Sequence, residues 1–194
     1  MNTRFDLIQY LINTYNFKSY LELGCRVAED NIVSINYIQC EHKDSVDIQS
    51  NGNNYVMSTD IFFNGPGMYK KYDIIFVDAD HEKNAVKKDI LNSLERLNNN
   101  GCIICHDISP PTEAFLATRY CNNAWETWAL LRSTRSDLEM YATLIDPVGV
   151  GIIRKGTQIL YDKPIQYSWD YLCSNRNELL NIIDIDTFKS IFKK

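Results

Sequence analysis

The stretch YDIIFVDADHEKN, from Tyr72 to Asn84, holds the clearest strand signal in the chain, and this signal stops abruptly after Val77. The apolar run Ile74–Val77 is followed at once by Asp78, Asp80 and His81. A short continuous apolar run is typical of a strand that is buried on both faces of a parallel sheet. The stretch therefore predicts a buried strand whose carboxyl end carries titratable side chains.

The rest of the chain alternates strand-like and helix-like segments in the same way. Apolar periodicity predicts helices at 6–15, 82–97, 124–132, 178–183 and 186–192. Strands are predicted at 19–24, 43–48, 55–57, 74–77 and 102–107, with a pair at 139–144 and 148–154. This alternation predicts an α/β fold, a mainly parallel sheet with helices on its faces. The 194 residues fit a single domain, 1–194, with a helical tail from about 165 to 194.

Composition excludes several classes of protein. Hydrophobic residues make up 45% and charged residues 23%, which is ordinary for a globular chain. The net charge of −5 argues against a nucleic-acid partner, which needs a basic face. No run of about 18 apolar residues exists to span a membrane, and the first residues do not have the layout of a signal peptide. The six cysteines show no disulfide-like spacing, so we expect a reduced, cytoplasmic protein.

Polar side chains gather at the carboxyl ends of the predicted strands. In open α/β sheets, ligands bind outside these ends. The rule places the following residues at one site: Glu22, Gly24, Asp47, Asp60, Asp78, Asp80, His81, His106 and Asp107.

The acids and histidines of this set favour a metal site. Two acids two residues apart in an extended segment point the same way, which would bring Asp78 and Asp80 together. His106 and Asp107 end a neighbouring strand in the same manner. Such ligands suit Mg²⁺ or Mn²⁺, with Zn²⁺ or Fe²⁺ as alternatives. The competing interpretation is that Asp80 caps the following helix, and His81 is open to capping or substrate contact.

The segment LELGCR, 21–26, offers a weaker nucleotide-binding signal. A strand that ends at Gly24 lets backbone amides approach a ligand, and Asp47 follows at roughly the distance expected of a ribose-binding acid. The full G-x-G-x-x-G is absent. A glycine that simply ends a strand is the alternative.

Two further patterns are interpreted as core. Cys102 and Cys105 form a C-x-x-C inside a buried strand, where small apolar thiols are common. Trp125 and Trp128 lie three apart on a predicted helix, and aromatic residues at that spacing are more often buried than substrate-binding.

The order of these motifs resembles class I S-adenosylmethionine-dependent methyltransferases. The motifs are LELG (21–24), DIIFVDADH (73–81) and NGCIICHDISPPTEA (100–114). The resemblance implies a Rossmann-like, doubly wound sheet of seven strands with an antiparallel C-terminal pair. It implies that S-adenosylmethionine contacts Glu22 and Gly24 at its methionine–ribose end and Asp47 at the ribose hydroxyls. It also implies that Ser58 and Asp60 lie near the adenine, and Asp78 near the transferred methyl group.

The chain is also similar to sugar O-methyltransferases that use a divalent metal. That similarity implies Asp78 and Asp107 as ligands of Mg²⁺ or Mn²⁺ and Asp80 as the catalytic base. His106 stands where that group has an acid, so a histidine ligand and a histidine base without metal both stay open.

The function implied is O-methylation of a small polar acceptor, a carbohydrate or glycan precursor. The alternatives are a methyltransferase acting on protein or nucleic acid and a non-catalytic module that binds the cofactor. The oligomeric state, including a homo-oligomer, is left open by the sequence.

Overall fold

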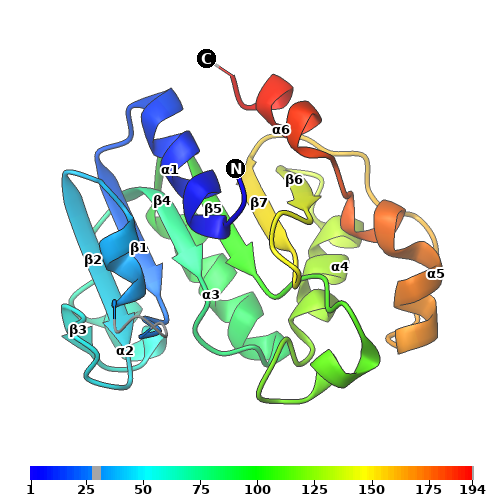
Figure 1. The fold of residues 1–194 in the computed structure, drawn as a ribbon, viewed down its shortest axis with the longest axis horizontal. Coiled ribbons are helices and arrows are strands. Elements are labelled where there is room, and N and C mark those ends of the chain that lie inside the picture. Colours follow the sequence, from blue (N-terminus) through cyan, green and yellow to red (C-terminus); the bar gives the residue numbers. More distant parts are fainter. Residues whose placement is uncertain (28–31, 194) are drawn as a thin grey trace.

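The computed structural model describes residues 1–27 and 32–193, which form a seven-stranded sheet between layers of helices (Figure 1). The strands are β1 (Ser19–Leu23), β2 (His42–Asp47), β3 (Tyr55–Val56), β4 (Tyr72–Val77), β5 (Leu97–His106), β6 (Leu138–Thr143) and β7 (Val150–Lys155). Their order is β3-β2-β1-β4-β5-β7-β6, and β7 runs antiparallel to both of its neighbours. The other neighbouring pairs are parallel. The predicted Rossmann-like fold with an antiparallel C-terminal pair is confirmed.

Helices cover both faces of this sheet. They are α1 (Arg4–Tyr15), α2 (Thr59–Asn64), α3 (Lys83–Arg96), α4 (Ala124–Thr134), α5 (Trp169–Leu180) and α6 (Ile185–Ile191). Two 3-10 turns, η1 (Ser34–Tyr37) and η2 (Glu113–Leu116), lie between them. The side chains of α2, α3, α4 and α5 pack into the core on one face of the sheet, and those of α1 and α6 into the core on the other.

Strand β4 shows why the apolar run predicts a central strand. Ile75 and Val77 point into the core beneath α3, whereas Ile74 and Phe76 point into the core beneath α1. All four side chains are at most 3% exposed. A strand buried on both faces needs apolar residues at every position, which explains the unbroken run.

The C-terminal tail differs from its prediction. Helix α5 spans Trp169–Leu180 rather than 178–183, and it ends at Asn181, whose φ of 54° lies in the left-handed region. Ile183 then donates its backbone N–H to Ala142 of β6 at 2.8 Å. The segment after Leu180 therefore leaves the helix because it bonds to the sheet edge, which the apolar period of the sequence could not reveal.

The two core interpretations are confirmed. Trp125 and Trp128 are 2% and 0% exposed, and Trp128 donates its indole N–H to the carbonyl of Leu180 at 3.0 Å. Cys102 and Cys105 are buried within β5. Within residues 1–27 and 32–193, every helix is too short or too polar to cross a bilayer.

Candidate functional site

A cavity of about 1060 Å³ opens at the carboxyl ends of the parallel strands. Nine of the predicted site residues line it: Gly24, Asp47, Ser58, Asp60, Asp78, Asp80, His81, His106 and Asp107. These residues come from segments that are far apart in the sequence, and the parallel sheet brings them together. The cavity has the location and the size expected of a small-molecule site.

Gly24 allows the ends of β1 and β4 to approach each other closely. Its φ is +89°, in the region that favours glycine. A Cβ atom at this position would lie 2.1 Å from the carbonyl oxygen of Asp78. A glycine is therefore required here because the backbones of the two strand ends are in contact. Its role is more than to end a strand.

Glu22 is the one predicted site residue that the described cavity lining does not include. Its side chain is fully buried and accepts hydrogen bonds from Tyr20 at 2.8 Å and from Ser34. Burial raises the pKa of Glu22 to about 7, against the opposing effect of these hydrogen bonds. The structure places Glu22 beside the site, within the protein interior.

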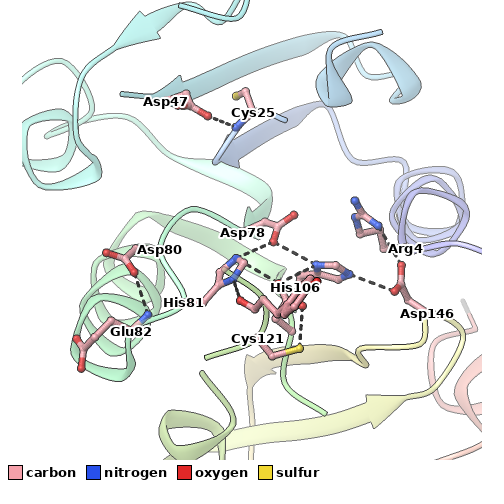
Figure 2. Close-up of polar contacts among 12 residues, drawn as sticks. Arg4, Cys25, Asp47, Asp78, Asp80, His81, Glu82, His106, Cys121 and Asp146 are labelled. Atoms are coloured by element: carbon pink, nitrogen blue, oxygen red, sulfur yellow. Dashed lines mark hydrogen bonds and ion pairs between the residues drawn. The ribbon is translucent and has the colours of Figure 1, made fainter. Parts of the chain in front are cut away.

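Asp47 shapes the loops that border the cavity. Its carboxylate accepts the backbone N–H of Cys25 at 2.7 Å (Figure 2) and that of Gln49 at 2.8 Å. The acid thus connects the end of β2 to the turn after β1. Its place between two strand ends suits a ribose-binding role, which stays a prediction.

Ser58 and Asp60 lie at the start of α2, a helix that the sequence analysis did not predict. Ser58 caps the helix by accepting the backbone N–H of Ile61 at 3.3 Å. Asp60 forms an ion pair with Lys88 of α3. Both residues line the cavity, and their contacts with adenine stay predictions.

Four titratable side chains meet beside the ends of β4 and β5. His106 Nδ1 lies 3.2 Å from Asp78 Oδ1 and 3.3 Å from Asp107 Oδ2. His81 Nε2 lies 3.5 Å from Asp78 Oδ1 and 3.2 Å from Asp107 Oδ2. We call these four residues the acid–histidine cluster. Two carboxylates and two imidazoles thus share one small volume (Figure 2).

The charges of the cluster stabilise one another. Burial alone would raise the pKa of Asp78, but the neighbouring His106 holds it well below its usual range. Burial alone would lower the pKa of both histidines, but the carboxylates outweigh it. They raise the pKa of His81 to about 9 and that of His106 well above its usual range. At neutral pH the cluster therefore holds two protonated imidazoles beside an ionised Asp78.

Two residues that the sequence analysis missed extend this network. Asp146 lies in the turn between β6 and β7, with Oδ1 3.4 Å from His106 Nε2. Arg4, at the start of α1, donates to Asp146 Oδ2 at 3.0 Å (Figure 2). Asp146 precedes a proline, which favoured interpreting it only as part of a turn, and no local signal linked Arg4 to the site.

Asp80 lies apart from the cluster. It is exposed, and its carboxylate accepts the backbone N–H of Glu82 at 2.9 Å (Figure 2). The expectation that Asp78 and Asp80 point together fails because β4 ends at Val77 and the chain then turns. The alternative that Asp80 caps the helix is also wrong, because Glu82 caps α3 by accepting from Asn84 and Ala85.

Asp78, His81 and Asp107 meet the geometric needs of a metal site. Each offers one ligand atom, and these atoms all lie within 4.8 Å of one another. Asp107 adopts a φ of 60°, which is uncommon for a non-glycine residue and often marks a functional position. Two carboxylates and one imidazole form a donor set that suits Mg²⁺ or Mn²⁺. The residues present therefore fit a divalent cation.

Comparisons with known proteins agree with this geometry. Residues 33–108 match a family model described as "Methyltransferase domain". No protein of curated function matches the chain at the sequence level.

Three solved structures illustrate the structural similarity. A Staphylococcus aureus protein, provisionally assigned as a caffeoyl-CoA O-methyltransferase, aligns with a TM-score of 0.55 and 19% identity over 78% of this chain and 82% of its own. The O-methyltransferase TomG from Streptomyces achromogenes, in complex with SAM, aligns with a TM-score of 0.54 and 14% identity over 78% and 79%.

MycE, a methyltransferase of the mycinamycin biosynthetic pathway solved with Mg, SAH and mycinamycin VI, aligns with a TM-score of 0.52 and 10% identity. The alignment covers 81% of this chain and 50% of MycE. The chain thus resembles methyltransferases in two respects, a family-model match over residues 33–108 and a fold shared over most of the chain.

Proposed function

We propose that the chain is an S-adenosylmethionine-dependent O-methyltransferase whose acceptor is a small polar molecule such as a sugar or glycan precursor. One observation carries the proposal. In a methyltransferase fold, the predicted cofactor residues Gly24, Asp47, Ser58 and Asp60 and the acid–histidine cluster line the same cavity. A bound cofactor and an acceptor hydroxyl would therefore share one cavity.

The chemistry requires activation of a weak nucleophile. A sugar hydroxyl has a pKa far above neutral, so a base must remove its proton as the methyl group moves. Asp80 is exposed on the cavity lining and stands outside the cluster, so it is available to accept that proton. His106 is held protonated by its carboxylate neighbours, which suits it to stabilise negative charge on the acceptor oxygen. Orientation of the hydroxyl in line with the sulfonium supplies much of the rate.

Asp78 and Asp107 would hold the divalent cation in the metal-assisted form of this proposal, with His81 as a third ligand. When bound, such a cation would supply positive charge that stabilises the developing alkoxide. Asp78, His81 and Asp107 support this form through their geometry. MycE, which is similar in fold, was solved with Mg.

Calorimetry with S-adenosylmethionine and S-adenosylhomocysteine tests the proposal directly. Binding in the micromolar range is expected, and no binding at millimolar cofactor would refute it. Binding of cofactor without transfer to any member of a glycan and protein panel would instead identify a non-catalytic module.

The metal requirement needs its own experiment. Transfer should stop in EDTA and return on addition of Mg²⁺ or Mn²⁺ if Asp78 and Asp107 are ligands. A matched variant, Asp44→Asn, alters an acid of β2 that pairs with Lys70 away from the cluster, and it should keep the same metal response. Full activity in EDTA would leave Asp80 and His106 to act without metal.

A further inference from the structure

The segment between β5 and α4 forms one wall of the cavity, beside the acid–histidine cluster. Phe115, Arg119 and Tyr120 of this segment line the cavity. The rings of Phe115 and Tyr120 are stacked with centroids 4.8 Å apart, and Tyr120 is 38% exposed. The wall thus combines aromatic surface with one cationic side chain.

The backbone attaches this wall to the cluster. The Tyr120 carbonyl accepts a hydrogen bond from His81 Nδ1, and Cys121 Sγ lies 3.2 Å from Asp107 Oδ1. Arg119 directly precedes these two anchored residues. A group held by Arg119 would therefore lie a short distance from the place where the acceptor hydroxyl must react.

Arg119 differs from most arginines of the described chain in having no anionic or carbonyl acceptor. Arg119 is exposed, and its guanidinium lies over the Tyr120 ring, 4.9 Å from the centroid. The arginines that do donate to an oxygen are Arg4, Arg96, Arg132, Arg135, Arg154 and Arg176. A guanidinium without a partner on a cavity wall is available to bind a ligand anion.

Arg26 also lines the cavity without an oxygen acceptor among the described residues, but it belongs to the turn after β1 and not to the segment between β5 and α4. It follows Gly24 and Cys25, next to the predicted cofactor residues. Arg119 instead lies on the wall attached to His81 and Asp107. The position of Arg119 therefore assigns it to the acceptor rather than to the cofactor.

We infer that the acceptor carries an anionic group, a phosphate or a carboxylate, and that Arg119 binds it while the hydroxyl lies at the acid–histidine cluster. This inference rests on the proposed function and narrows its acceptor class. The stacked pair of Phe115 and Tyr120 would pack against the apolar face of the same acceptor. Arg119 is then a specificity-determining residue. It selects the acceptor and does not change the methyl-transfer step.

Acceptor binding in the presence of saturating S-adenosylhomocysteine tests the inference. The probes are glucose, glucose 1-phosphate and glucuronate, so that phosphate and carboxylate are compared with a neutral sugar. We expect at least one anionic probe to bind about 10-fold to 100-fold more tightly than glucose, the range for one charge-assisted pair. The Arg119→Gln variant should abolish that preference, whereas Arg119→Lys should keep part of it.

Arg135→Gln is the matched control, because Arg135 pairs with Asp137 on the surface and does not line the cavity. It should keep the full preference for the anionic probe. Binding of S-adenosylhomocysteine should be unchanged in Arg119→Gln, Arg119→Lys and Arg135→Gln. If the parent protein itself does not bind S-adenosylhomocysteine, the proposed function is refuted instead. Equal binding of glucose and both anionic probes, no binding of any probe, or an anionic preference that survives in Arg119→Gln would overturn the inference.

Discussion

Replacing Gly24 with alanine should destabilise the protein more than its backbone conformation alone explains. The positive φ of +89° costs an alanine about 1–2 kcal/mol relative to glycine. The added Cβ would also lie 2.1 Å from the Asp78 carbonyl oxygen and 2.5 Å from its carbonyl carbon. Because both are backbone atoms at the end of a central strand, relief requires β1 and β4 to separate, at a further cost of about 1–3 kcal/mol.

Gly52 provides a matched control for the conformational part of this cost. Its φ is +82°, but a Cβ there would meet only the Val33 side chain, at an ordinary 3.5 Å. Gly52→Ala should therefore lose about 1–2 kcal/mol, and Gly24→Ala about 2–5 kcal/mol. The stiffening of the unfolded chain by alanine is common to both variants and cancels in the difference.

Urea unfolding measures both losses. With a slope of about 2 kcal/mol per molar urea, the midpoint of Gly24→Ala should fall by roughly 1–2.5 M with little change in slope. Cofactor affinity should fall as well, because the displaced Asp78 belongs to the cavity. Equal losses of stability in the two glycine variants would show that the ends of β1 and β4 are not in contact, and would refute the reasoning.

Three other changes test separate features of the structure. Glu22 has a folded-state pKa of about 7 against an ordinary 4.5. Between these two pH values the folded state therefore binds more protons than the unfolded state. The free energy of unfolding should fall by about 3 kcal/mol as the pH rises through this range. The variant Glu22→Gln should lose that fall in pH-dependent unfolding, and an unchanged slope would contradict it. Trp128→Phe should cost about 2–4 kcal/mol in urea unfolding, because it leaves the Leu180 carbonyl unpaired and a void in the core. His106→Asp should be destabilised in EDTA and regain thermal stability with millimolar Mg²⁺, whereas a melting temperature indifferent to Mg²⁺ would argue against a metal site there.

The fold could be predicted because its signals are local. Each buried strand carries its own apolar run, and α3 carries its own period, so 82–97 was predicted and Lys83–Arg96 is observed. The short helix α2 was missed because its six residues are too few to show a period. The tail helix was misplaced because contacts with β6, not periodicity, end α5.

The acid–histidine cluster could be predicted only in part. The rule for parallel strands brought Asp78, His106 and Asp107 together correctly at one edge. The choice of Asp80 over His81 assumed that the strand continued past Val77, so that side chains two apart would face the same way. The assumption fails because the chain turns after Val77. The turn brings His81, three residues after Asp78, against the Asp78 side chain in place of Asp80.

Charge balance explains why residues remote in the sequence complete the site. Asp78, Asp107 and Asp146 would be costly to bury as unpaired carboxylates. Each of them contacts a cationic partner: His81, His106 or Arg4. Three acids and three such partners sum to zero when both histidines are protonated, which the raised pKa values favour.

An acid in place of His106, as the resemblance leads one to expect, would remove a positive charge and add a negative one. The cluster together with Asp146 and Arg4 would then hold four carboxylates against two cations, and a divalent ion would restore neutrality. With histidine, the protein supplies much of that positive charge itself. A metal ion that enters between Asp78 and Asp107 must compete with the protons that those carboxylates hold on the histidines. Metal affinity in this chain should therefore rise with pH more steeply than in a variant whose site is made of acids alone.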